Sequence, residues 1–310
     1  MYPKINCAAA YEVDPGWPAK PAGIQWGAMP GVAVDARDRV YTFSRSDDPI
    51  QVYASDGAFI RSWGRGLFRQ PHGLRIDREG NIWITDCLRH VVEQYTPEGR
   101  LLLRLGTDGV PGCDAAHFNQ PTDLAIAPGG DLFIADGYVN ARVVHFDAQG
   151  RFIHAWGELG VGRGQLSLPH SIAVNSQGRV YVGERNNVRI QVFDADGTPL
   201  DEWRNLITPW GMCLLPGDEL WVIGSSPMRW TEGDQLGGPP KDQIFMRFDP
   251  QGKALALWSV PKGTDGRERP GECNWAHGIA VDSVGSLYIG DIMGRRVQKF
   301  LYLREEAART

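Results

Sequence analysis

Short runs of apolar residues recur along the whole chain and are separated by turn residues. In one stretch they cover 124–127, 132–135, 142–146 and 152–156, each rich in Val, Ile, Phe or Trp and bounded by Gly, Asp or Asn. This pattern is typical of β-strands joined by tight turns. The longer period of amphipathic helices is missing, so the sequence predicts an all-β fold.

The pattern of strands and turns recurs six times along the chain. The units begin near residues 30, 71, 121, 169, 209 and 276. Most of the spacings fall in the range of roughly 40 to 50 residues that propeller blades show. We therefore expect a six-bladed β-propeller that forms a single domain over residues 1–310, with residues 1–27 as an N-terminal closing segment.

The last unit predicts a closure of the ring by the N-terminus. Its strands at 278–281, 286–289 and 296–303 are followed by a polar tail without a fourth strand. An incomplete last blade would leave an unpaired strand edge. We expect residues 8–13 to pair onto this blade and to join the two ends of the chain.

Composition narrows the class of protein. The net charge of −5 argues against a nucleic-acid partner, which usually requires a basic face. No apolar stretch approaches the length of a membrane span, and the start lacks the apolar core of a signal peptide. Five cysteines without a C-x-x-C pair favour a reducing compartment. We expect a cytoplasmic protein without nucleic-acid or membrane partners.

Three histidines occupy the second position of alternate units. His72, His170 and His277 belong to the second, fourth and sixth units. The corresponding positions of the other units are assigned to Gly31, Thr122 and Trp210. In a ring of six blades the three imidazoles should meet at the axis about 120° apart. Three neutral imidazoles predict a zinc site, or a site for another divalent transition metal, with a coordination position left open.

A second set of residues lies fourteen positions further on, at the end of the second strand: Arg45, Asp86, Asp136, Glu184, Gly224 and Asp291. Asp86 and Glu184 belong to units with a histidine. One hypothesis is that these two carboxylates orient the histidines by hydrogen bonds. The alternative is that the acidic residues of this set only form turns of the repeat.

Tyr138, Arg45 and Arg185 begin loops that should overlook the axis. Long insertions at 106–120, 157–168, 225–243 and 260–275 fall on the same face, which predicts a binding rim there. A pair of Arg side chains suits a carboxylate-bearing substrate. A Tyr beside a divalent cation and Arg has its phenolate favoured, and can act as a general base.

Several segments resemble a known family. PHGLRIDREGNIWITD, HFNQPTDLAIAP, IADGYVNARVVHF and LPHSIAVNSQGRVYVGERNNVRIQVF are similar to segments of the peptidyl-α-hydroxyglycine α-amidating lyases, which are six-bladed NHL-type propellers. The resemblance covers about residues 28–302. It implies that the three histidines bind zinc, that Tyr138 is the base, and that Arg45 and Arg185 hold the carboxylate of the substrate. It also implies cleavage of an N-acyl α-hydroxyglycine to a primary amide and glyoxylate.

The chain departs from this family at a second metal site. The resemblance implies a structural calcium held by the backbone carbonyls of Val32 and Leu74 and by an Asp directly after the third histidine. That residue is Gly278 here. The calcium site therefore lacks its only carboxylate, which argues against a bound calcium ion.

Two other functions remain open from the residues alone. The same three-histidine site could hydrolyse a small amide or lactone with metal-bound hydroxide. The propeller could also be a non-catalytic module that binds protein or RNA on its rim. The leading hypothesis is a metal-dependent carbon–nitrogen lyase that acts on a small-molecule or peptide-like acidic substrate.

Overall fold

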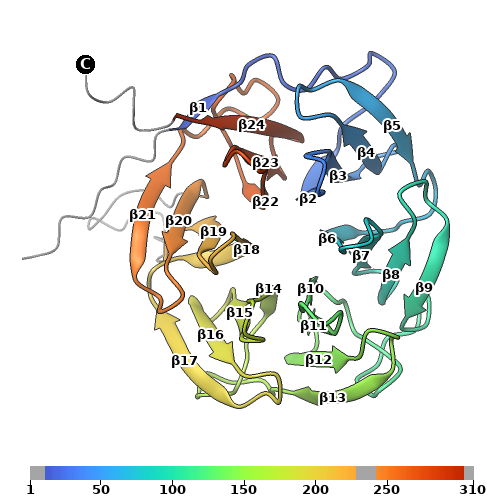
Figure 1. Cartoon of the computed structure of the whole chain (residues 1–310), viewed down its shortest axis with the longest axis vertical. Helices are drawn as coiled ribbons and strands as arrows, with labels where there is room; N and C mark the ends of the chain where they lie inside the picture. The colour runs from blue at the N-terminus through green and yellow to red at the C-terminus, as the bar shows by residue number, and fades with distance from the viewer. Residues whose placement is uncertain (1–10, 228–241, 304–310) are drawn as a thin grey trace, which may run out of the picture.

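The structure, a computed structural model, describes residues 11–227 and 242–303. These residues form six four-stranded antiparallel sheets arranged as the blades of a ring (Figure 1). The predicted all-β six-bladed propeller is confirmed. No helix among the described residues is long and apolar enough to cross a membrane.

Each blade runs from an innermost strand at the axis to an outermost strand at the rim of the ring. The first three blades contain β2 (Ala28–Val34), β3 (Val40–Arg45), β4 (Ile50–Tyr53) and β5 (Phe59–Trp63); β6 (Pro71–Ile76), β7 (Ile82–Asp86), β8 (Val91–Tyr95) and β9 (Leu101–Leu105); and β10 (Asp123–Ile126), β11 (Leu132–Asp136), β12 (Arg142–Phe146) and β13 (Phe152–Trp156). The others contain β14 (Pro169–Val174), β15 (Val180–Glu184), β16 (Arg189–Phe193) and β17 (Pro199–Arg204); β18 (Thr208–Leu214), β19 (Leu220–Ser225), β20 (Ile244–Phe248) and β21 (Ala254–Ser259); and β22 (Ala276–Val281), β23 (Leu287–Asp291) and β24 (Arg296–Tyr302), completed by β1 (Tyr11–Val13).

Turns with an acidic or amide side chain fix the first hairpin of most blades. In blade one, Asp35 Oδ1 accepts hydrogen bonds from the backbone N–H groups of Arg37 and Arg39, both at 2.9 Å. Asn175 and Asp282 make the same pair of bonds in blades four and six. Such side chains stabilise tight turns because they satisfy backbone donors that the strands leave free.

Apolar side chains between neighbouring blades make up the core. One buried cluster joins Tyr41, Phe43 and Ile50 of blade one to Ile82 and Ile84 of blade two. Large aromatic side chains from the outermost strands pack against the next blade: Trp63, Trp156, Trp203 and Trp258. The core is therefore distributed around the ring, between neighbouring blades.

The N-terminus closes the ring as predicted. β1 pairs with β24, with Tyr11 opposite Tyr302 and Val13 opposite Phe300 (Figure 1). Residues 8–10 of the predicted closing strand lie outside the described residues. Tyr11 and Val13 also pack on the apolar cluster between blades five and six. The last blade thus combines three strands from the C-terminal end with one from the N-terminal end.

Deletion of residues 1–14 should lower the melting temperature by about 5–10 °C, because it removes the pairing of β1 and the apolar contacts of Tyr11 and Val13. Differential scanning calorimetry would measure this change. Deletion of residues 1–10 is the matched control, because it retains β1. Equal melting temperatures for the two truncated proteins would rule out this closure.

The first hairpin of each blade reveals an error of one residue in the predicted alignment of the repeats. The residue pairs next to the turn are Val34 with Val40, Ile76 with Ile82, and Val281 with Leu287. Counting back from these turns, Pro30 occupies the position of His72 and His277. The assignment of Gly31 to that position is wrong, because Pro30 lies one residue closer to its turn than Pro71 does, so that Met29 and not Pro30 corresponds to Pro71.

Candidate metal centre

The three predicted histidines meet at the axis. His72, His170 and His277 lie at the start of the innermost strands β6, β14 and β22. Their ring centroids are 4.8, 4.9 and 5.0 Å apart, which is a nearly equilateral triangle. Three of their ring nitrogens lie within 4.8 Å of one another, and all three side chains are buried. The predicted convergence of the imidazoles is confirmed.

Backbone carbonyls of the next blade orient the rings. His72 Nδ1 lies 2.6 Å from the carbonyl oxygen of Thr122, and His170 Nδ1 lies 2.7 Å from that of Trp210. His277 Nδ1 lies 2.9 Å from the carbonyl oxygen of Pro30. A carbonyl can only accept, so each Nδ1 carries the proton and each Nε2 presents its lone pair. The arrangement alternates around the ring, since even blades supply the imidazole and odd blades supply the carbonyl from the same repeat position.

Burial keeps the imidazoles neutral. Desolvation lowers the pKa of His72 and His170 well below the usual value and lowers that of His277 to about 4, and nearby positive charges act in the same direction. Neutral imidazoles with free Nε2 lone pairs are the form that binds a divalent metal. The donor set therefore fits a transition metal such as zinc.

Tyr138 lies beside the candidate metal-binding nitrogens of two histidines. Its hydroxyl is 2.9 Å from His72 Nε2 and 3.2 Å from His170 Nε2. Because both nitrogens lack a proton in this tautomer, the single hydrogen of the phenol is donated to one or the other of them. Burial raises the pKa of Tyr138 to about 12, whereas Arg185 and Arg45 lower it. The hydroxyl is placed where a base close to a bound metal would act.

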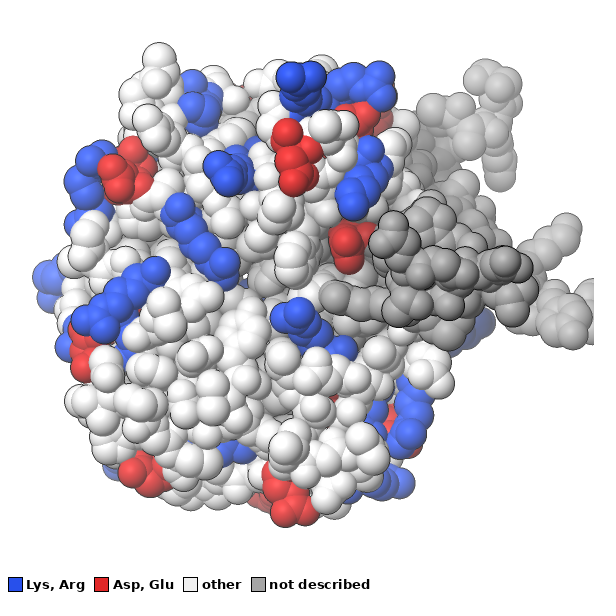
Figure 2. All heavy atoms as spheres, turned by 180° about the vertical axis from the view of Figure 1, so that it is seen from behind, with Lys and Arg blue, Asp and Glu red and all other residues white. Residues whose placement is uncertain are grey.

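Arg45 and Arg185 flank the centre from opposite blades. Arg185 directly follows Glu184, the last residue of β15, and Arg45 ends the longer β3. Counted from the first hairpin, both occupy the same repeat position, in blades one and four. In Figure 2, which shows the face opposite to that of Figure 1, basic side chains approach the central opening from two sides. Two guanidinium groups at such positions can hold a carboxylate between them.

The sequence alignment placed Arg45 in the acidic set, and this is also wrong by one residue. Ser44, not Arg45, lies at the position of Asp86. Its hydroxyl oxygen accepts a 2.9 Å hydrogen bond from the N–H group of Gly27, which is in the segment that enters the blade. The apparent exception in the acidic pattern is therefore a serine with the same hydrogen-bonding role.

The carboxylates of Asp86 and Glu184 do not orient the histidines. Asp86 accepts hydrogen bonds from the N–H groups of Arg69 and Gln70 at 2.6 and 2.9 Å. Since backbone carbonyls already hold each Nδ1, no position is left for a carboxylate partner. The hypothesis of acidic partners is wrong. Asp86 instead binds the loop that enters β6, and it also accepts a 3.2 Å hydrogen bond from the Arg89 N–H in the turn after β7, as the alternative hypothesis expected.

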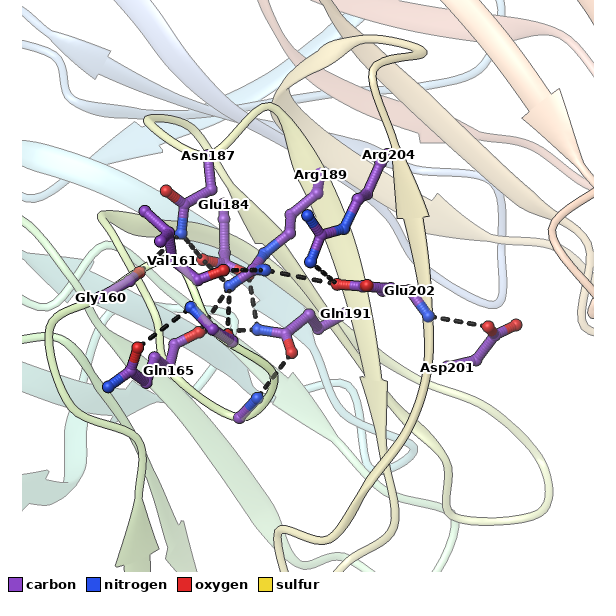
Figure 3. A network of polar contacts seen from close by, with 12 residues as sticks. Gly160, Val161, Gln165, Glu184, Asn187, Arg189, Gln191, Asp201, Glu202 and Arg204 are labelled. Atoms are coloured by element: carbon purple, nitrogen blue, oxygen red, sulfur yellow. Dashed lines mark hydrogen bonds and ion pairs between the residues drawn. The ribbon is translucent and has the colours of Figure 1, made fainter.

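Glu184 is the centre of a larger polar network at the loop of residues 157–168 (Figure 3). It accepts hydrogen bonds from the Ser167 N–H at 2.9 Å, from Arg189 Nε at 2.6 Å and from Gln191 Nε2 at 2.7 Å. Arg189 in turn donates to the carbonyl oxygens of Val161 and Gln165. The network holds the loop that leads into β14 and so fixes the start of the strand on which His170 lies.

Trp210 contributes to the site although no role was predicted for its side chain. Its carbonyl oxygen binds His170, and its indole packs edge-on to the same imidazole at 5.4 Å between centroids. The guanidinium carbon of Arg185 lies 4.4 Å from the Trp210 ring, at the distance of a cation–π contact. The signal for this residue was its repeat position, which is the one that the histidines occupy in other blades.

The residues at the implied calcium site do not fit a calcium ion. The carbonyl oxygen of Leu74 already accepts a 2.9 Å hydrogen bond from Arg75 Nη1. A Cβ atom at Gly278 would lie 2.7 Å from the carbonyl oxygen of Pro30 and 3.2 Å from the nitrogen of Val32. A carboxylate side chain after His277 would therefore require the backbone of blade one to shift. Both contacts argue against calcium at these residues.

Comparisons with known proteins place the chain in a family. The NHL repeat matches at residues 118–146 and 166–193, in blades three and four. NHL repeat-containing protein 3 from Homo sapiens is 36% identical, and the match covers 94% of this chain and 84% of that protein. The chain belongs to the NHL-repeat propeller family.

Lyases are found among the relatives of this NHL propeller. Peptidyl-alpha-hydroxyglycine alpha-amidating lyase 1 from Drosophila melanogaster is 25% identical over 96% of this chain and 61% of that protein. Peptidyl-glycine alpha-amidating monooxygenase B from Xenopus laevis is 32% identical over 96% of this chain. The chain spans only about a third of that longer protein, 36% of its length.

A solved structure supports the fold alone. The streptogramin B lyase structure superposes with a TM-score of 0.64 at 14% identity and covers 91% of this chain and 95% of that chain. At this level of identity the likeness shows the six-bladed architecture and carries no information on the substrate of the NHL propeller described above.

Proposed function

We propose that this protein is a metal-dependent lyase that cleaves the C–N bond of an N-substituted α-hydroxy acid to give an amide and glyoxylate. The observation that supports this most directly is the Tyr138 hydroxyl, which lies 2.9 Å from His72 Nε2 within a buried three-histidine cluster. Two relatives that are named alpha-amidating lyases also support the proposal. The peptide part of the substrate is left undefined by this proposal.

The chain's own residues can carry out each proton and binding step. Arg45 and Arg185 bind the carboxylate and orient the hydroxyl-bearing carbon toward the axis. Tyr138, as phenolate, takes the proton from the α-hydroxyl group. The carbonyl of glyoxylate forms as the C–N bond breaks, and the nitrogen takes the electron pair and a proton. Tyr138 can return the proton that it took, so no water is consumed.

The three Nε2 atoms of His72, His170 and His277 would hold the metal in this scheme. A bound divalent ion supplies Lewis-acid stabilisation of the negative charge that develops on the substrate oxygen. Zinc is our proposal for this ion because three neutral imidazoles with one open position are its common catalytic set. Trp210 supports the site by stacking under Arg185.

The test is a measurement of metal content followed by an assay of glyoxylate release from α-hydroxyhippurate. One transition-metal ion per chain together with glyoxylate release supports the lyase. Stoichiometric metal without glyoxylate would overturn it and favour a different small-molecule reaction such as hydrolysis of an amide or lactone. A protein without metal and without glyoxylate would also overturn it and leave a binding module.

The two arginines should distinguish acidic from neutral substrates. Arg45→Ala and Arg185→Ala are each expected to lower kcat/KM for α-hydroxyhippurate by about 10- to 100-fold, because a charge-assisted hydrogen bond to the carboxylate is lost. The methyl ester of the same substrate should be affected far less. Arg151→Ala, in an exposed turn of blade three, is the control. Equal losses on the acid and the ester would remove carboxylate recognition from the proposal.

A further inference from the structure

One long cationic side chain lies in the hub of the ring below the histidines. Three residues after His72 comes Arg75, and the residues at its repeat position in the other blades are small: Ala33, Ala125, Ala173, Cys213 and Ala280. All six line an axial cavity of about 270 Å³ on the side of the hub away from the histidines. The small neighbours leave room for one guanidinium at the axis.

Arg75 connects blades across this hub. Its Nη1 donates to the carbonyl oxygen of Leu74 at 2.9 Å, and its Nη2 lies 2.5 Å from Asp123 Oδ2 in blade three. The same Nη2 makes a longer contact of 3.5 Å with the carbonyl oxygen of Met212. Met212 belongs to β18 of blade five, which faces blade two across the axis. Three oxygens from three blades therefore surround one positive group.

Asp123 is the acidic residue of this layer. Residues at its repeat position in the other blades are Gly31, Gly73, Ser171, Gly211 and Gly278. Its carboxylate also accepts hydrogen bonds from the N–H groups of Leu124 at 2.9 Å and Ile172 at 3.1 Å. A Cβ atom at Gly73 would lie 2.9 Å from Asp123 Oδ1, so glycine at that position makes room for the carboxylate. Burial raises the pKa of Asp123 to about 6, and Arg75 is the largest influence that lowers it.

We infer that the guanidinium of Arg75, paired with Asp123, is the axial cation of this propeller and takes the place of a bound divalent metal ion. A buried carboxylate and carbonyl oxygens that converge on an axis require a positive partner, because leaving them without one is costly in a low-dielectric interior. In this chain the positive partner is part of the polypeptide. The inference does not depend on the lyase proposal, because it concerns the layer below the histidines.

The position of the acid supports this inference. Gly278 leaves blade six without a carboxylate at the axis, while Asp123 places one in blade three, on the opposite side of the ring. The Leu74 carbonyl, which a calcium ion would need, is bound by Arg75 instead. Gly278 leaves blade six without a carboxylate ligand, while Asp123 supplies a negative charge and Arg75 a positive charge from within the chain.

The experiment compares melting temperatures in calcium-depleted buffer and with millimolar Ca²⁺. Depletion by a resin is preferred to a chelator in the sample, because a chelator would also remove a metal from the three histidines. The proteins are wild type, Arg75→Met, Arg75→Lys, the double variant Arg75→Met with Asp123→Asn, and the exposed control Arg151→Met. Calcium content is measured by plasma mass spectrometry.

We expect wild type to contain no stoichiometric calcium and to melt at the same temperature in both buffers. Arg75→Met should melt about 5–10 °C lower in depleted buffer and recover part of this loss with Ca²⁺. The double variant should not respond to Ca²⁺, because it lacks the carboxylate. A calcium-dependent wild type, or the same calcium response in the single and double variants, would overturn the inference. If Arg75→Met does not fold, wild type and Arg75→Lys test the inference. Wild type should still melt at the same temperature in both buffers. Arg75→Lys, which keeps a positive charge, should melt between wild type and the double variant and show no calcium response; a calcium response of either protein would overturn the inference.

Discussion

Replacement of His72 with alanine should abolish stoichiometric metal binding and lower glyoxylate release by about 1,000-fold or more. Removal of one of three imidazoles leaves two donors and an enlarged, open centre. The loss of Lewis-acid stabilisation is worth several kcal/mol, and each 1.4 kcal/mol corresponds to about tenfold in rate. Plasma mass spectrometry and the α-hydroxyhippurate assay would measure the two effects on the same preparation.

His117→Ala is the matched control for this experiment. His117 is bonded to Asp114 in the loop before β10 and lies outside the three-histidine cluster. It should retain metal and activity. Because His72 also binds the Thr122 carbonyl, circular dichroism must show that the His72 variant is folded. A folded His72→Ala protein that retains one metal ion per chain and full activity would refute the proposed centre.

The fold and the three-histidine cluster were predictable because both follow from the repeat itself. Once the chain is a closed ring of six units, any residue at the second position of the second, fourth and sixth units must reach the axis in threefold arrangement. His72, His170 and His277 needed no other information. The pairing of β1 with β24 followed in the same way from the missing strand of the last blade.

The predicted repeat alignment of blade one was wrong by one residue because the wrong residue was used to align the units. A proline was used to align the units, whereas the register of each blade is set by its first hairpin, which has an Asp or Asn at the turn in four of the six blades. Asp35 corresponds to Asp77, which places Pro30 at the histidine position and pairs Arg45 with Arg185. Alignment by the turn would have shown the two arginines as equivalent residues of opposite blades.

The partners of the histidines could not be predicted from side-chain identities. Each Nδ1 is held by a backbone carbonyl. Every residue has a backbone carbonyl, so the sequence does not show which carbonyl will lie beside a given histidine. The acidic residues at the ends of the second strands were predicted to orient the histidines because they lie on the same face of the ring in the repeat. Their hydrogen bonds go instead to the loops that enter the innermost strands, where Asp86 and Glu184 satisfy backbone donors.

Two residues in the hub below the candidate metal centre are unusual in the sequence, but only the structure shows that they interact. An arginine among small residues (four alanines and a cysteine) at one repeat position, and an aspartate among four glycines and a serine at another, are both unusual. Their spacing of 48 residues says nothing of contact until the ring places β6 beside β10. Such pairs in neighbouring repeats can be searched for in sequences once the register is known.

Tyr138→Phe should lower kcat for glyoxylate release by about 100- to 10,000-fold, which is the usual effect of removing a general base. The ring is retained, so packing against His72 and His170 should change little. Metal content should stay at the wild-type level, because the hydroxyl is not one of the three imidazole donors. KM should also change little, since Arg45 and Arg185 still hold the carboxylate.

The separation of these quantities is what identifies the role of Tyr138. Loss of kcat with metal and KM preserved indicates a group that acts in the chemical step. Tyr302→Phe, on the exposed part of β24, is the control and should behave as wild type. A Tyr138→Phe protein that loses its metal would assign the hydroxyl to metal binding. Wild-type kcat with full metal content would exclude Tyr138 as the base, because no proton could then depend on its oxygen.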